Sequence, residues 1–199
     1  DALTHAVEGY TCSWHTDLTD GLCLNAVRLI LEYLPRAVAD GADREAREKM
    51  HNAAACAGLG FGNAMASMAH AMGHVLGAVF HLHHGRAVAL CLPYTIEFAA
   101  RCAPQRFADL AAIVGLPRSD DEQAARALAE RIRALARQIG NPISLAEAGV
   151  PREAFEAELV KLVNDAFNDT QMVTAAREPS FDELERLFRY AYEGRGVDF

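Results

Sequence analysis

Five side chains in the first 84 residues have the types and the spacing of a transition-metal site. Asp1 and His5 lie four residues apart, as do His70 and His74, and His84 follows soon after the second pair. Residues four apart share one face of a helix, so each pair can point at one spot. A carboxylate and imidazoles that converge are a typical ligand set for Fe, Zn, Ni or Cu. Spacing alone leaves a structural role for these histidines open, because pairs four apart also occur by chance.

The remaining histidines give a weaker signal. His81 and His83 stand beside His84, so residue type alone does not select the donor among the three. His83 lies one position from His84 and would point elsewhere. His15 and His51 have no partner at helical spacing, and we interpret both as surface or polar-contact residues.

The elements that must position these donors are helices. Ala and Leu dominate the chain, and runs of β-branched residues with period two are missing. Gly58, Gly60 and Gly62 are expected to loosen the backbone before the histidine-bearing helix, whose small residues place it in the core. We expect one all-α, bundle-like domain over residues 1–199. Its predicted helices cover residues 1–10, 17–39, 44–58, 64–81, 86–100, 105–114, 120–140, 152–168 and 180–194.

Composition excludes several classes of function. The formal net charge of −8 and the lack of Lys/Arg runs argue against a nucleic-acid binder. No apolar run approaches the roughly 20 residues that a membrane helix needs, and no glycine-rich nucleotide loop is present. The five cysteines are odd in number and lack a CxxC spacing, which favours free buried thiols in a reducing cytoplasm.

At the candidate metal residues the chain resembles the iron-containing alcohol dehydrogenase family (group III). The segment DALTHAVEGY is similar to the family's DALTHAxExY, and the stretch from His70 to Pro93 is similar to its HxxxHxxGxxxxxxHGxxxxxxLP. The resemblance implies the helical C-terminal domain of a dehydroquinate synthase-like fold. It also implies that the chain is a fragment of a two-domain enzyme whose N-terminal α/β domain, absent from these 199 residues, holds the nicotinamide cofactor.

The resemblance assigns roles by position. It implies four metal ligands, which are Asp1, His5, His70 and His84. His74 falls on a further histidine near the substrate and the nicotinamide, which is expected to be catalytic and not a ligand. Phe61 falls where the family places an aromatic residue that lines the substrate pocket.

The function implied is a cytoplasmic, iron-dependent and NAD(P)-linked alcohol dehydrogenase that interconverts an alcohol and its aldehyde or ketone. Fe²⁺ is the expected metal, Zn²⁺ is a possible substitute, and NAD or NADP would be supplied by the N-terminal domain. We expect a homo-oligomer, and we expect the 199 residues alone to be inactive. Two alternatives come from other classes: an all-α metal-dependent hydrolase, and a non-catalytic helical interaction domain.

The chain departs from the family near its end. The family often reads D-x-C-T-x-T-N-P-R, whereas residues 169–177 read DTQMVTAAR. Gln171 replaces the Cys, and Ala175 and Ala176 replace Asn-Pro. Many relatives also have Pro where this chain has His83. Residues 169–177 correspond to a segment that borders the substrate cleft in the family. Because this segment differs here, the choice of alcohol stays open.

Overall fold

The computed structural model describes residues 1–118 and 120–199, which contain helices and no strand. This confirms the all-α prediction. The elements are α1 (Ala2–Thr11), α2 (Asp17–Ala39), α3 (Arg44–Asn63), α4 (Met68–Phe80), α5 (His84–Ala99), α6 (Pro104–Ile113), α7 (Asp121–Gln138), α8 (Arg152–Phe167), the short 3₁₀ helix η1 (Thr170–Thr174) and α9 (Phe181–Glu193).

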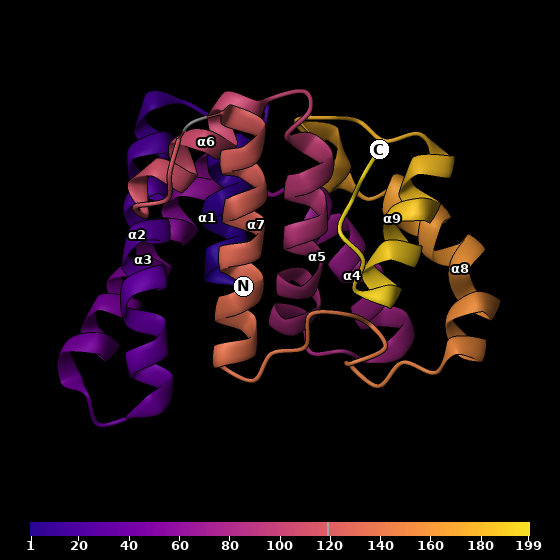
Figure 1. Ribbon diagram of the computed structural model, residues 1–199, viewed down its shortest axis with the longest axis horizontal. Helices are drawn as coiled ribbons and strands as arrows, with labels where there is room; N and C mark the ends of the chain where they lie inside the picture. The colour runs from indigo at the N-terminus through magenta and orange to yellow at the C-terminus, as the bar shows by residue number, and fades with distance from the viewer. Residues whose placement is uncertain (119) are drawn as a thin grey trace.

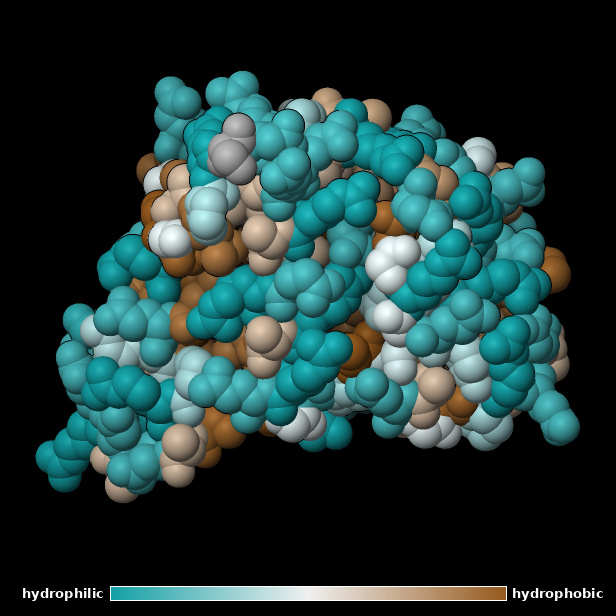
Figure 2. All heavy atoms as spheres, viewed as in Figure 1, coloured by the Kyte–Doolittle hydropathy of each residue, from teal (hydrophilic) through white to brown (hydrophobic). Residues whose placement is uncertain are grey.

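The candidate metal residues lie on α1, α4 and α5, which contact one another. Helices α2 and α3 pack against each other and against α1 at one end of the molecule (Figure 1). Helix α4 packs against α5 and α8, and α9 contacts α5 and α8 at the other end. The largest fully buried side chains include Tyr94, Phe98, Phe155 and Phe188. Polar residues cover most of the face in Figure 2, and apolar residues show mainly in the furrows between helices.

Capping side chains begin several helices. The Asp43 side chain accepts from the backbone N–H of Ala46 at the start of α3. Ser180 and Glu183 form a reciprocal capping box at the start of α9, which ends at Gly194 in a left-handed conformation with φ of 73°. No helix among the described residues is long and apolar enough to cross a membrane.

The predicted loosening at the three glycines is wrong. Helix α3 continues through Gly58, Gly60 and Gly62 to Asn63. A Cβ atom at Gly60 would lie 2.5 Å from Cys23 Sγ, so this glycine lets α3 pack closely on α2. Nothing lies within 4 Å of a Cβ added at Gly58 or Gly62. Gly60 therefore serves helix packing, and the three glycines do not break the helix.

Two neighbouring boundaries shift as well. Helix α4 begins at Met68 instead of residue 64, because the chain leaves α3 only at Asn63. Helix α5 begins at His84 instead of residue 86. His84 therefore occupies the first turn of a helix, where the backbone fixes its position more firmly than the expected turn would.

The prediction that the histidine-bearing helix lies in the core is confirmed. Ala69, Ala71 and Met72 of α4 have no exposed surface. At Gly73 an added Cβ would lie 2.5 Å from Val88 Cγ1 and 2.9 Å from Val88 Cα. Helices α4 and α5, which carry His70 and His84, therefore approach each other through this glycine.

Gly73→Ala should destabilise the protein by about 1–3 kcal/mol, because the new methyl group overpacks against the Val88 backbone. Thermal unfolding would measure the change, with roughly 2–4 °C of Tm per kcal/mol expected for a domain of this size. Gly58→Ala is the matched control, because it is exposed, lies in a helix and meets nothing within 4 Å. It should be neutral or stabilising by up to about 1 kcal/mol. Equal Tm values for the two variants would contradict the packing argument.

Candidate metal centre

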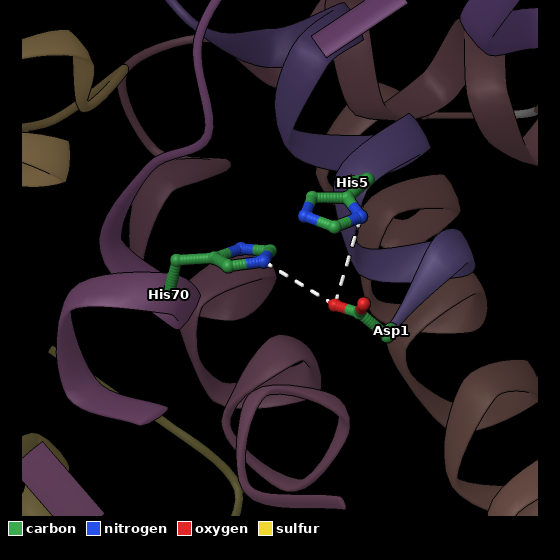
Figure 3. Close-up of side chains that lie close together, drawn as sticks. All are labelled: Asp1, His5 and His70. Atoms are coloured by element: carbon green, nitrogen blue, oxygen red, sulfur yellow. Dashed lines mark ion pairs between the residues drawn. The ribbon is translucent and has the colours of Figure 1, made fainter. Parts of the chain in front are cut away.

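Three of the predicted ligands converge on one point (Figure 3). Asp1 caps the N-terminus of α1 and His5 lies one turn further on the same face, while His70 reaches the point from the first turn of α4. Asp1 Oδ1 lies 3.6 Å from His5 Nδ1 and 3.5 Å from His70 Nε2. One ligand atom from each of the three residues lies within 4.8 Å of the other two.

His84 joins this group from the first turn of α5. Its Nε2 atom lies 3.3 Å from Asp1 Oδ1, and its ring centroid lies 5.5 Å from that of His70. Three imidazole nitrogens, from His5, His70 and His84, therefore lie around a single carboxylate oxygen, Asp1 Oδ1. The side chains of Asp1 and His84 are about half exposed, whereas that of His70 is only 3% exposed. The group thus has a buried side at His70 and an open side at His84.

The spacing of the donors fits a transition-metal ion. With metal–ligand bonds of about 2.1 Å, two ligands of a tetrahedral site lie roughly 3.4 Å apart. The three nitrogen–oxygen distances to Asp1 are 3.3, 3.5 and 3.6 Å. His70 Nε2 is buried and has no hydrogen-bond partner among residues 1–118 and 120–199. A buried nitrogen without a partner is costly, and a metal ion would satisfy it.

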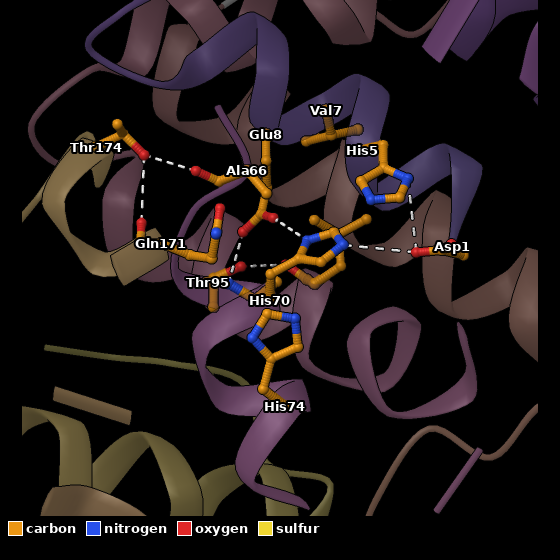
Figure 4. Close-up of polar contacts among 12 residues, drawn as sticks. Asp1, His5, Val7, Glu8, Ala66, His70, His74, Thr95, Gln171 and Thr174 are labelled. Carbon is orange, nitrogen blue, oxygen red and sulfur yellow. Dashed lines mark hydrogen bonds and ion pairs between the residues drawn. The ribbon is translucent and has the colours of Figure 1, made fainter. Parts of the chain in front are cut away.

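The glutamate Glu8 holds His70 in place. Its Oε2 lies 2.5 Å from His70 Nδ1, and its Oε1 accepts the backbone N–H of Ala69 at 2.6 Å (Figure 4). Both side chains are almost fully buried. A carboxylate on Nδ1 orients the imidazole so that Nε2 faces the donors, as outer carboxylates do in metal sites. Sequence reasoning missed Glu8, although it lies on the same helix face as Asp1 and His5.

The environment of His5 keeps its imidazole neutral. Burial, together with the nearby His70, lowers the pKa of His5 to about 3. The ring stacks on Phe61, with centroids 3.8 Å apart and planes 8° apart. Phe61, expected to line the substrate pocket, reaches this position because α3 extends past the glycines. A neutral imidazole is the form that binds a metal.

The expected catalytic residue, His74, lies one turn beyond His70 on α4. Its ring centroid is 5.8 Å from that of His70 and 5.5 Å from that of His84. Its Nδ1 lies 2.8 Å from Asp169 Oδ2, and its side chain is partly exposed. Sequence reasoning did not identify Asp169 as a partner, because 95 residues separate it from His74.

A cleft of about 1110 Å³ opens beside Asp1. The charged and polar residues of its lining include Asp1, His83, Arg86, Arg137, Asn141 and Glu147. The cleft lies between the start of α5 and the end of α7. Of the four candidate donors, Asp1 contributes to this lining.

The other four histidines are not in the group of close ligand atoms found among the described residues. His81 ends α4 in a left-handed conformation with φ of 56° and is exposed, as is His83. His15 pairs with Asp20 at 3.2 Å, and His51 is exposed on α3, as the surface interpretation predicts for both.

The cysteines are unpaired, as expected. Cys12, Cys23 and Cys91 are buried. Cys56 is only partly buried and Cys102 is exposed, so the prediction of burial holds for three of the five.

Fold and site together define an all-helical domain in which Asp1, His5 and His70 share one point and His84 approaches the same Asp1 oxygen. The family model for the C-terminal region of the Fe-containing alcohol dehydrogenase family matches residues 1–192. The chain therefore belongs to the Fe-containing alcohol dehydrogenase family, as the resemblance in the sequence predicted.

Individual relatives agree with this assignment. The chain is 35% identical over 199 residues to the NADPH-dependent butanol dehydrogenase of Clostridium saccharobutylicum, covering 100% of this chain and 51% of that protein. It superposes on the crystal structure of a 1,3-propanediol oxidoreductase with a TM-score of 0.91 at 34% identity, covering 96% of this chain and 50% of the other. An alcohol dehydrogenase from Oenococcus oeni gives a TM-score of 0.91 at 33% identity, with the same coverage. The chain thus spans about half the length of these relatives.

Proposed function

We propose that this chain is the metal-binding half of an NAD(P)-linked alcohol dehydrogenase that interconverts an alcohol with its aldehyde or ketone. The observation that carries the proposal is the convergence of three imidazoles on Asp1 Oδ1, with the buried His70 Nε2 lacking a hydrogen-bond partner among the described residues. Family membership supplies the reaction class, and the relatives named as butanol dehydrogenase and propanediol oxidoreductase support an alcohol as substrate.

The four donors, Asp1, His5, His70 and His84, would hold a divalent metal. Fe²⁺ is the proposed ion, and Zn²⁺ accepts the same nitrogen and oxygen ligands. When bound, such a metal supplies Lewis-acid polarisation of the substrate oxygen. NAD or NADP would come from a separate N-terminal nucleotide-binding domain, facing the open side of the donor group. The five free cysteines suit a reducing cytoplasm.

The chain's own residues have separate tasks around the substrate. Phe61 stacks on His5 and offers an apolar surface beside the donors for the carbon skeleton of the alcohol. His74 lies next to His70 and His84 and is partly exposed, so it can carry a proton between the substrate and solvent. Glu8 keeps His70 oriented from the buried side.

The two alternatives account for less of the structure. A helical interaction domain with packing histidines gives no reason for a buried imidazole nitrogen without a hydrogen-bond partner. A metal-dependent hydrolase would use the same donors to activate water, but the relatives named above are dehydrogenases.

Metal removal and reconstitution of the full-length protein would test the proposal. A chelator should abolish NAD(P)-linked alcohol oxidation, and anaerobic Fe²⁺ should restore it with about one metal per chain. Metal should also raise the Tm, because it binds only the folded state. Metal-dependent hydrolysis without any nicotinamide reduction would favour the hydrolase. A protein that binds no metal under either condition would favour the interaction domain.

Glu8→Gln should weaken metal binding by about 10–100-fold in the full-length protein. The amide keeps the volume of the carboxylate but removes the charge that orients His70 through Nδ1. Competition with a chelator of known affinity would measure the dissociation constant. Glu48→Gln, an exposed position on α3, serves as the control and should bind metal as the wild type does. Unchanged affinity in Glu8→Gln would show that the carboxylate only fills space.

A further inference from the structure

A second carboxylate–imidazole pair lies beside the candidate metal centre. His74 Nδ1 and Asp169 Oδ2 are 2.8 Å apart, and the two residues come from α4 and from the start of η1. The Asp169 side chain is largely buried, whereas the His74 ring is about one-third exposed. The pair therefore has a sheltered carboxylate and an imidazole that reaches open space.

Backbone contacts hold the carboxylate of Asp169 in position. Its Oδ1 accepts the backbone N–H of Gln171 at 2.8 Å, which caps η1. The hydroxyl of Thr174 at the other end of η1 donates to the Ala66 carbonyl at 2.5 Å, just before α4 begins (Figure 4). The element that carries Asp169 is thus tied to the segment that leads into the helix of His74.

This geometry determines which nitrogen of His74 carries the proton. An ionised carboxylate only accepts hydrogen bonds, so Nδ1 must donate to Asp169. In the neutral ring Nε2 then has a free lone pair. The ring centroid lies 5.5 Å from that of His84 and 5.8 Å from that of His70, so His74 belongs to the same site as the donors.

We infer that Asp169 is a positioning residue for the proposed alcohol oxidation, fixing His74 in the tautomer whose Nε2 can accept a proton. The inference rests on the proposed function. In that reaction the C–H bond of the carbinol breaks and its hydride reduces the nicotinamide. The O–H bond also breaks, and the proton forms an N–H bond at His74 Nε2 before it passes to solvent. In the reverse direction Nε2 returns the proton to the new hydroxyl oxygen.

The first test is Asp169→Asn in the full-length, metal-loaded protein. An amide can donate its own hydrogen to Nδ1, which moves the ring proton to Nε2 and removes the acceptor. We expect kcat for alcohol oxidation to fall about 10²-fold or more. Metal content and the KM for the alcohol should stay within twofold. Asp165→Asn, whose carboxylate pairs with Lys161 on the exposed face of α8, is the matched control and should keep the wild-type kcat. An unchanged kcat in Asp169→Asn would overturn the inference.

A double-mutant cycle separates positioning from a general structural effect. If Asp169 acts through His74, Asp169→Asn should add little to the loss already caused by His74→Ala. An equal further loss in the His74→Ala background would overturn the inference, because Asp169 would then act independently of His74.

The tautomer of His74 can also be measured by NMR, which tests the inference independently of enzyme activity. In Zn²⁺-loaded full-length protein labelled with ¹⁵N-histidine, His74→Ala identifies the His74 signals. The wild type should show His74 with its proton on Nδ1, and Asp169→Asn should lose that state. A wild-type ring with its proton on Nε2 would overturn the inference even if Asp169→Asn fails to fold. If the wild type shows the Nδ1–H tautomer but no alcohol oxidation, the positioning contact stands and the proposed function fails.

Discussion

Replacing His70 with alanine in the full-length protein should remove the metal and lower alcohol oxidation by about 10³-fold or more. His70 is the most buried donor of the four, and its Nε2 has no partner other than the proposed ion. Alanine removes that donor and also leaves Glu8 buried with only the Ala69 N–H to satisfy it. Metal binding and activity should therefore disappear together.

Elemental analysis of the purified variant, combined with nicotinamide reduction rates, would measure both effects. His51→Ala is the control, because His51 is an exposed histidine on α3 without a partner at helical spacing. It should keep wild-type metal content and activity. A metal-free His70→Ala protein that still oxidises alcohols would refute the proposed role of the site.

The helical period explains why the donors could be predicted. Asp1 and His5 share a face of α1, and His70 and His74 share a face of α4, so local spacing alone brings each pair together. The two faces meet only because α1, α4 and α5 pack together. Residue spacing could not predict that packing, whereas the resemblance to a family did imply it. The convergence on one oxygen of Asp1 is a tertiary result.

The contacts of Glu8 and Asp169 could not be predicted from the sequence, because they also depend on tertiary packing. Glu8 follows Asp1 and His5 at helical spacing, but a glutamate is usually exposed to solvent, so the sequence gives no sign that this one is buried. Its role appears only when α4 places His70 Nδ1 against it. Asp169 is 95 residues from His74 in the chain, so no local sequence pattern predicts their contact. The glycines of α3 show the converse error: the helix continues through all three in spite of their low helix propensity, and Gly60 packs closely against Cys23.

A buried ion pair far from the donors joins three parts of the chain. Glu97 on α5 accepts from Arg133 Nη1 at 2.6 Å and from Nη2 at 2.9 Å, and it also accepts the backbone N–H of Val197 at 2.8 Å. Both side chains of the pair are almost completely buried. One carboxylate therefore links α5, α7 and the segment that follows α9.

Glu97→Ala should destabilise the protein by about 3–5 kcal/mol, because it leaves the buried Arg133 charge with only the exposed Glu130 carboxylate beside it and the Val197 N–H without its acceptor. Urea unfolding would measure the change in the free energy of unfolding. Glu130→Ala is a matched control, because Glu130 contacts the same Arg133 Nη1 at 2.7 Å but its side chain is 65% exposed. That variant should lose no more than about 1 kcal/mol. A Glu97→Leu/Arg133→Met double variant should recover most of the loss, since it removes both buried charges together. If the double variant is as unstable as Glu97→Ala, the loss comes from the shape of the cavity and not from an uncompensated charge.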